Sequence, residues 1–248
     1  MGKKILIGVL GLLFAACVSL VASRRHITNA FLFHPERGQE NTPAAWGLAY
    51  EEEWLTTDDG VRIQTWWLGN TARKLTVVFF HGNAGNMARH LDNAKALHAL
   101  GVCVLLVEYR GYGDSEGTPS EQGLYADALA AVRAARARAP QNRIVVFGRS
   151  LGGAVAIDVA AREPVDGLIA ESTFTSLPEL SEHASWIPFA GSLVTYEFGS
   201  LEKMARVRAP VLIIHGDADE LIPFAMWERL FAAATQARAR RFFGIAGG

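Results

Sequence analysis

The stretch from Ile144 to Ala156 reads IVVFGRSLGGAVA, and it joins a run of large apolar residues to a run of small ones. The first run is typical of a strand buried on both faces of a sheet, and the second is compatible with a helix. Between them, Gly148, Ser150 and Gly152 match the pattern G-x-S-x-G, in which small neighbours let a strand turn sharply into a helix and expose a serine. The stretch therefore raises the question whether Ser150 is a nucleophile, because a serine hydroxyl needs an adjacent base to become one.

Further apolar runs of strand length accompany this one, and segments that can form helices separate them. The apolar runs are LTVVFF (75–80), VCVLLVEY (102–109), GLIAES (167–172) and PVLIIHG (210–216). Buried strands that alternate with helices predict a mainly parallel sheet of the α/β class with helices on both faces. The expected helical segments are 86–99, 118–139, 151–163 and 223–235.

Two local signals refine this architecture. The residues AYEEEWLTT and VRIQTWWL flank the turn Asp58-Asp59-Gly60, which predicts an antiparallel hairpin before the parallel strands. The residues Thr118 to Glu121 form a capping box with proline at the first helical position, so the helix is expected to begin there and to end at Pro140.

The composition fits one α/β domain and argues against several kinds of site. The chain has 248 residues, of which 50% are hydrophobic, so it can bury a substantial core. Its 24 basic and 25 acidic residues leave no positive excess to hold nucleic acid. The two cysteines, Cys17 and Cys103, have no histidine neighbours at metal-ligand spacing. We therefore expect no nucleic-acid partner, no metal and no cofactor.

An uncharged run near the N-terminus predicts a membrane segment. It extends from Ile5 to Ala22 and is flanked by basic residues at both ends, which define its orientation only weakly. As a helix its 18 residues span roughly 27 Å, close to the thickness of a bilayer core. We expect residues 1–23 to form a single-pass anchor that leaves the rest of the chain on the extracytoplasmic side. A cleaved signal and a lipoprotein modified at Cys17 are the alternatives.

The rest of the chain divides into a short segment and one domain. Residues 24–46 contain two prolines and a glycine that interrupt any periodicity, so they are expected as a linker or capping segment. Residues 47–248 contain all the predicted strands and form the domain. Only a short excursion fits between Glu171 and Pro210, so no large lid is expected.

The glycine-rich loop HGNAGN follows the strand LTVVFF directly. Attack by a serine on a carbonyl group needs preorganised N–H donors for the developing negative charge, and the residue after the nucleophile supplies one of them. We expect the N–H groups of Asn83 and Leu151 to be these donors. His81 and Gly82 open the loop, and His81 is expected to support it by hydrogen bonding rather than to act as a base.

An acidic residue is expected on a loop beside the nucleophile, where it would orient the base. The stretch HGDADELIP (215–223) offers Asp217 and Asp219. Asp219 is the preferred candidate because it lies past the strand end and four residues before Pro223. Glu171, at the end of another predicted strand, is the runner-up.

Together these phrases resemble the α/β-hydrolases, and more narrowly their single-pass, membrane-anchored branch related to protein depalmitoylases. The matching phrases are FLFHPE, HGNAGN, EYRGYGDSEGTPSEQGLYADA, GRSLGG, ESTFTSL and PVLIIHGDADELIP, and they span most of residues 31–245. The resemblance implies the α/β-hydrolase fold, with Ser150 as nucleophile, Asp219 as acid and the HGN loop as oxyanion site.

The chain departs from this family at its last residues. Members place the catalytic histidine after a final strand in a phrase similar to F-x-x-I-x-G-x-G-H, whereas here RRFFGIAGG ends at Gly248. All seven histidines precede Asp219, and only His183 lies in a segment flexible enough to be imagined near Ser150. A truncated or frameshifted chain is the expected reason, with a deliberately inactive homologue as the alternative. Without a base, turnover is expected to fall by a factor on the order of 10⁶.

The excursion between Glu171 and Pro210 is rich in apolar side chains. They are Leu177, Leu180, Trp186, Ile187, Phe189, Leu193, Val194, Tyr196 and Phe198. An apolar wall beside a nucleophile suits an acyl chain, and an anchor would bring the site to lipids or lipidated substrates. We expect hydrolysis of a carboxylic ester or thioester through an acyl-enzyme on Ser150. A serine peptidase on the same fold and a non-catalytic, membrane-anchored pseudohydrolase are the alternatives.

Overall fold

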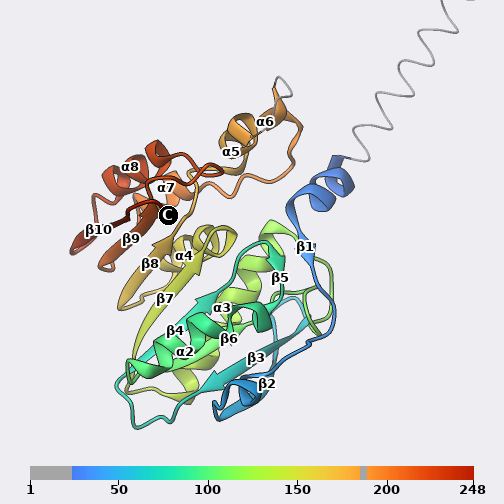
Figure 1. Ribbon diagram of the computed structural model, residues 1–248, viewed down its shortest axis with the longest axis vertical. Coiled ribbons are helices and arrows are strands. Elements are labelled where there is room, and N and C mark those ends of the chain that lie inside the picture. The colour runs from blue at the N-terminus through green and yellow to red at the C-terminus, as the bar shows by residue number, and fades with distance from the viewer. Residues whose placement is uncertain (1–23, 185–188) are drawn as a thin grey trace, which may run out of the picture.

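The computed structural model describes residues 24–184 and 189–248, and within them an eight-stranded sheet carries helices on both faces (Figure 1). The expected anchor at residues 5–22, with Cys17, and the apolar residues Trp186 and Ile187 lie outside the described residues. In the described part of the chain, no helix is both long enough and apolar enough to cross a membrane.

The sheet has the order β10-β9-β8-β7-β4-β6-β3-β2. Its first two strands in sequence form the hairpin predicted around Asp58, and β3 also pairs antiparallel with β6, whereas all the other pairs are parallel. This arrangement confirms the predicted fold class. The strands are β2 (Tyr50–Thr56), β3 (Arg62–Leu68), β4 (Leu75–Phe80), β6 (Cys103–Val107), β7 (Arg143–Arg149), β8 (Gly167–Glu171), β9 (Val211–Gly216) and β10 (Arg240–Ile245).

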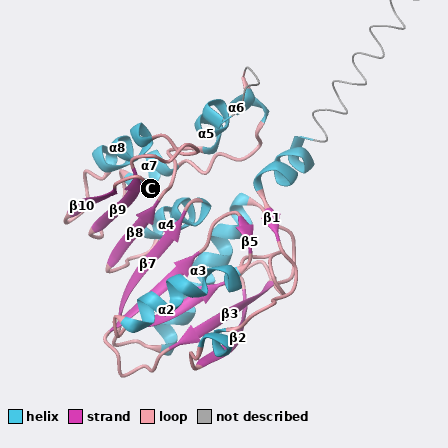
Figure 2. Ribbon diagram, viewed as in Figure 1, coloured by secondary structure: helices cyan, strands magenta, loops and turns pink. Residues whose placement is uncertain are grey.

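Helices of very different length cover the sheet (Figure 2). They are η1 (Pro43–Trp46), η2 (Met87–His90), α2 (Leu91–Ala99), α3 (Glu121–Arg138), α4 (Leu151–Arg162), α5 (Leu177–Ala184), α6 (Ala190–Leu193), α7 (Ser200–Met204) and α8 (Phe224–Ala233). The side chain of Ser120 accepts a hydrogen bond from the N–H of Gly123 and caps α3. The N-cap of the helix therefore lies two residues after the expected Thr118.

The segment 24–46 has more regular structure than its composition indicated. Residues 24–32 are helical, and η1 lies near the end of the segment. Between them, β1 (His34–Pro35) pairs in parallel with β5 (Ala84–Gly85), so the segment docks on the loop after β4. In Figure 1 the blue helix at 24–32 lies close to α5 and α6.

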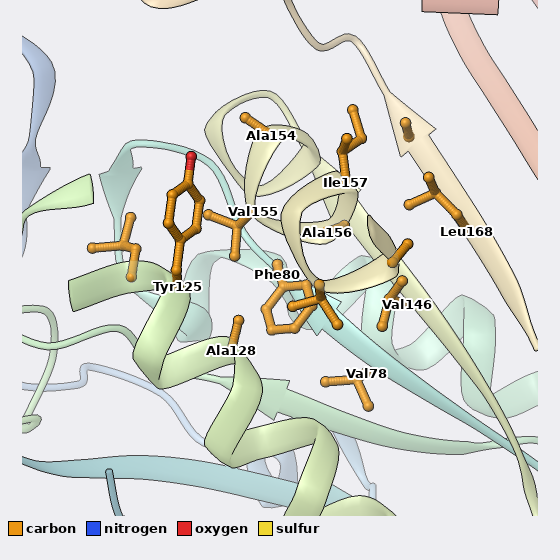
Figure 3. Packing of buried hydrophobic residues seen from close by; sticks show 14 of the residues in the cluster. Val78, Phe80, Tyr125, Ala128, Val146, Ala154, Val155, Ala156, Ile157 and Leu168 are labelled. Carbon is orange, nitrogen blue, oxygen red and sulfur yellow. The ribbon is translucent and has the colours of Figure 1, made fainter. Parts of the chain in front are cut away.

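The core consists of two apolar clusters, one on each face of the sheet. The larger cluster includes Val78 and Phe80 of β4, Tyr125 of α3 and Val155 of α4, which Figure 3 shows packed together. The smaller cluster lies under η2 and α2 on the other face. The small side chains of α3 and α4, among them Ala128, bring both helices close to the strands.

The outer strands are less well covered on the face opposite α8. There β9 presents half-buried Leu212 and Ile214, and β10 presents Phe243 with 61% of its surface exposed. Phe242, on the other face of β10, stacks on Trp227 of α8 with 3.5 Å between the ring centroids.

A buried arginine ties the hairpin turn to α3. The side chain of Arg110 donates to Asp127 at 2.9 Å and to Asp59 at 2.6 and 2.9 Å, and Asp127 is completely buried. Burial raises the pKa of Asp127 to about 6, although the hydrogen bonds from Arg110 oppose this shift. The Arg110 guanidinium, together with Thr57, holds the pKa of the more exposed Asp59 well below its usual range.

The substitution Arg110→Met tests this arrangement. It leaves the Asp127 carboxylate buried without its cationic partner, so the free energy of unfolding is expected to fall by about 3–5 kcal/mol. Urea denaturation followed by circular dichroism measures the change. The double variant Arg110→Met with Asp127→Leu removes both buried charges and is expected to recover much of the loss. A single variant with wild-type stability would contradict the proposed role of the pair.

Candidate active site

Ser150 occupies a strained turn between β7 and α4. Its backbone has φ 54° and ψ −119°, values that a residue with a side chain rarely adopts. Three hydrogen bonds fix the turn: the N–H of Ser150 donates to the carbonyl of Glu171, and its carbonyl accepts from Gly153 N–H and from the hydroxyl of Thr173, each at 2.9 Å. Ser150 itself is half-buried. The turn thus fixes the backbone of a half-buried serine.

The two glycines of the motif lie where no side chain fits. A Cβ atom built on Gly148 would lie 1.9 Å from the carbonyl oxygen of Gly152. A Cβ atom built on Gly152 would lie 2.1 Å from the carbonyl oxygen of Phe80. Because these obstacles are backbone atoms, which cannot rotate away, β4, β7 and α4 meet with no side chain between them.

The variant Gly152→Ala is expected to be strongly destabilised, because its methyl group must displace the end of β4. A loss of about 2 kcal/mol or more in the free energy of unfolding would match other overpacked cores. Gly82→Ala is the matched control, since its Cβ would meet Ser150 Cβ at an ordinary 3.6 Å. Thermal melts of both variants measure the difference. Equal melting temperatures for the two would show that the crowding at residue 152 is unimportant.

The loop after β4 lies beside Ser150, as the 3.6 Å approach at Gly82 indicates. The carbonyl of Asn83 accepts from the Tyr112 hydroxyl and from His34 N–H, and its side-chain amide donates to the carbonyl of Leu32 at 2.9 Å. None of these bonds uses the main-chain N–H of Asn83, and this N–H has no acceptor in the described part of the chain. The N–H of Leu151, at the first position of α4, likewise has no acceptor there. Both predicted oxyanion donors are therefore available.

Both nitrogens of the His81 ring are engaged by neighbours of this loop. Its Nε2 lies 3.0 Å from Oε1 of Glu108, and its Nδ1 lies 2.8 Å from the carbonyl oxygen of Gly82. The other oxygen of Glu108 accepts from Met87 N–H at 3.0 Å, and both side chains are buried. Glu108 was not among the residues predicted from the sequence, although its position at the end of a buried strand was a signal. The ring of His90 stacks on His81, and burial lowers the pKa of His90 to about 3, so this ring is neutral.

The two candidate aspartates after β9 have different partners. Oδ1 of Asp219 accepts hydrogen bonds from the N–H groups of Leu221 and Ile222, at 3.0 and 2.9 Å. These two bonds turn the loop that follows β9 back on itself. Oδ2 accepts no hydrogen bond from the described residues and lies 3.8 Å from Nε2 of His215. That imidazole is buried and hydrogen-bonds the carbonyl of Ile222. Asp217 instead accepts from Gly247 N–H at 2.7 Å and holds the C-terminal turn.

The runner-up acid, Glu171, belongs to a different contact. Its Oε1 lies 3.7 Å from Nε of Arg149, and burial raises the pKa of its carboxyl group. Its main-chain carbonyl already accepts the Ser150 N–H. Arg149, the variable residue before Ser150 in the G-x-S-x-G pattern, therefore has an acidic partner in Glu171.

The last residues pack against the loop that carries Asp219. The carbonyl of Gly248 accepts from Ala218 N–H at 3.0 Å, and a Cβ atom on Gly216 would lie 1.9 Å from that same oxygen. Among the described residues no histidine hydrogen-bonds Ser150, and His183 is exposed on α5. Within residues 24–184 and 189–248, no group of three or more His, Cys, Asp or Glu side chains is gathered in a way that could hold a metal ion.

A cavity of about 490 Å³ opens beside these loops. Asn83 of the oxyanion loop and Leu221 of the Asp219 loop both line it, whereas Ser150 does not. Its other walls come from the helix at 24–32 and from α5, α6 and the segment after α6. They are Ile27, Thr28, Phe31, Leu32, Leu177, Leu180, Ser181, Ala184, Ala190, Leu193 and Val194.

Comparison with known proteins gives a family match and a fold match. Residues 71–198 match the family model Hydrolase_4, described as serine aminopeptidase, S33. The chain is 39% identical over 210 residues to the Mycobacterium tuberculosis protein Rv2307c, a match that covers 83% of this chain and 74% of that protein. It is 37% identical to the Arabidopsis thaliana alpha/beta hydrolase domain-containing protein WAV2, over 78% of this chain and 69% of that protein. The structure of the Pyrococcus furiosus esterase Pf2001 is similar in fold, with a TM-score of 0.74 at 21% identity over 87% of this chain and 90% of that one.

Proposed function

The chain belongs to the α/β-hydrolase superfamily, and from that membership we propose that it is a serine hydrolase which cleaves carboxylic esters or thioesters through an acyl-enzyme on Ser150. The observation that carries the proposal is the strained turn at Ser150, beside two N–H groups that have no acceptor among residues 24–184 and 189–248. A serine on such a turn and free N–H donors near it are two of the features that nucleophilic attack on a carbonyl requires.

In the proposed reaction the oxygen of Ser150 attacks the carbonyl carbon of the substrate and its proton passes to a base. The negative charge that develops on the carbonyl oxygen is stabilised by the N–H groups of Asn83 and Leu151. The leaving alcohol or thiol takes the proton from the base, and water then hydrolyses the acyl-enzyme. Asp219, whose Oδ2 accepts no hydrogen bond from the described residues, is the group that would orient an imidazole base.

Within residues 24–184 and 189–248, no histidine hydrogen-bonds Ser150 to act as its base. His81 has both nitrogens engaged, and His215 is buried and hydrogen-bonded to Ile222. We therefore propose that the 248-residue chain alone turns over slowly, as the sequence analysis expected.

Chemical rescue tests both parts of this proposal. Imidazole added to the buffer is expected to raise hydrolysis of a p-nitrophenyl acyl ester by the 248-residue chain, because it supplies the missing proton acceptor. Ser150→Ala is the matched control and reports the direct reaction of imidazole with the ester, which must be subtracted. Release of p-nitrophenolate measures the rate. If the chain and Ser150→Ala gave the same rate at every imidazole concentration, Ser150 would not be the nucleophile.

A serine peptidase is the second candidate, and the description of the matched family model as a serine aminopeptidase favours it. Aminoacyl p-nitroanilides in the same rescue assay separate the two, since only the leaving group differs. Ester or thioester cleavage without anilide cleavage supports the first proposal. If neither class reacts in the presence of imidazole, the remaining candidate is the non-catalytic pseudohydrolase.

We also propose that residues 5–22 anchor the chain in a membrane and that its acyl substrates are lipids or lipidated proteins, as in the depalmitoylase branch that the sequence resembles. The support is the uncharged run between the lysines and Arg24. After expression, the full chain is expected to stay with the membrane pellet in alkaline carbonate, and a chain that begins at residue 24 to leave it. Release of the full chain by carbonate would exclude a spanning anchor.

A further inference from the structure

We propose that the helix at residues 24–32 forms the outer wall of a pocket for one long, unbranched acyl chain. This inference rests on the proposed function, because it assigns the acyl part of the substrate that Ser150 would attack. The sequence analysis placed these residues in a linker or capping segment and the acyl-binding wall in the excursion after Glu171. The structure instead divides the cavity wall between the two segments.

The chemistry of the cavity wall selects an uncharged, apolar ligand. None of the described residues that line the cavity carries a charged side chain, and their polar side chains are those of Thr28, Asn83 and Ser181. The apolar residues come from both sides, such as Ile27 and Phe31 on the helix and Leu180 and Leu193 opposite them. A volume of about 490 Å³ lies within the range of small-molecule sites.

The position of the cavity connects it to the reaction. Asn83, whose N–H is a proposed oxyanion donor, lines one part of the wall, and Leu221, two residues after Asp219, lines another. A ligand in the cavity can therefore have its carbonyl group at the catalytic loops while its hydrocarbon chain extends toward the helix at 24–32. The edges of the wall are open to solvent, with Phe31 81% and Leu193 49% exposed. The hydrocarbon chain of the ligand can enter the cavity there.

The helix is held in place by specific polar contacts rather than by apolar contact alone. Near its start, Arg24 donates to the main-chain carbonyls of residues 192, 193 and 194. In its middle, Thr28 accepts from Thr195 N–H at 3.2 Å, and Asn29 accepts from the Tyr196 hydroxyl at 2.6 Å. At its end, the carbonyl of Leu32 accepts from the side chain of Asn83. The same helix therefore closes the cavity and supports the oxyanion loop.

The direction of the chain indicates where the ligand comes from. Residue 24 lies two positions after the end of the uncharged run Ile5–Ala22, so a bilayer that held this run would lie near the start of the helix that walls the cavity. The group that the cavity would recognise is an acyl chain held in that bilayer. Its carrier is either a glycerolipid or an S-acylated protein.

Photo-crosslinking in liposomes tests the inference without any need for catalysis. The full chain carrying Ser150→Ala is incubated with a diazirine derivative of palmitic acid, irradiated and digested, and the labelled peptides are identified by mass spectrometry. Label is expected on peptides that contain residues 27–32 and 190–194. Label on residues 1–23 reports probe dissolved in the bilayer and is the internal reference for every ratio.

Two variants fill the cavity from opposite walls. Ile27→Trp and Leu193→Trp are each expected to lower the ratio of cavity label to reference label at least fivefold. Leu100→Trp is the matched control, because Leu100 is 75% exposed and does not line the cavity, and its ratio is expected to stay unchanged. Thermal melts establish that all three variants fold. Folded Ile27→Trp and Leu193→Trp proteins with unchanged ratios would overturn the inference.

Competition identifies the length and carrier of the acyl chain. Unlabelled fatty acids are expected to compete more strongly by up to about fourfold for each added methylene group until the cavity is full. Equal competition by a monoacylglycerol and by an S-acyl-cysteine peptide would show that only the chain is recognised, and unequal competition would identify the carrier. If neither competed, the cavity would not be an acyl site.

Ser150-dependent ester cleavage with no cavity label would leave the proposed function intact and remove only this inference.

Discussion

The backbone contact between the end of β4 and the first turn of α4 is the constraint on which the candidate site depends. The carbonyl oxygen of Phe80 occupies the space where a side chain at residue 152 would begin, and the carbonyl of Gly152 does the same for residue 148. Because the strands and the helix meet without side chains between them, the chain can pass from β7 into α4 only through a sharp turn. The positive φ of Ser150 follows from this geometry. The same contact brings the loop that contains Asn83 to the side of the serine.

The segment that follows β6 supports this contact from several directions. The Glu108 carboxylate hydrogen-bonds the His81 ring and the N–H of Met87. The Tyr112 hydroxyl donates to the carbonyl of Asn83, and Arg110 joins the hairpin turn to α3. These groups are buried or nearly so, and each is hydrogen-bonded. Buried charges add little net stability, because removing them from water costs about as much as the pairing returns. Their contribution here is to select one arrangement of the loops, since any other arrangement would leave a buried charge without a partner.

The features that the sequence predicted well have local physical causes. Apolar runs of strand length such as residues 75–80 are typical of buried strands, so the sheet could be predicted, and the Asp-Gly turn identified the hairpin. The G-x-S-x-G pattern indicated the turn at Ser150 because only glycine fits two of its positions.

The features that the sequence did not predict depend on contacts between distant residues. Glu108 meets His81 only because β6 pairs with β4. The helix at 24–32 is stabilised by the carbonyls of residues 192–194, about 170 positions away, and its own composition resembles that of a linker. The start of α3 was misplaced for a related reason. Thr118 and Ser120 are both good caps, and the choice between them depends on Glu121, whose carboxylate accepts the N–H groups of Glu197 and Phe198.

The arrangement around Ser150 also bears on the choice between an enzyme and a non-catalytic protein. A non-glycine residue in such a backbone conformation costs on the order of 1–3 kcal/mol, which persists only where the surroundings enforce it. Here two glycines, the Thr173 hydroxyl and the Glu171 carbonyl enforce it, and none of them requires a histidine. A surface that only bound a partner would gain nothing from a half-buried serine on a strained turn. Nor would it gain from the N–H groups of Asn83 and Leu151, which have no acceptor among the described residues. Both features have a direct use in acyl transfer, and for that reason the geometry favours a hydrolase over an interaction protein.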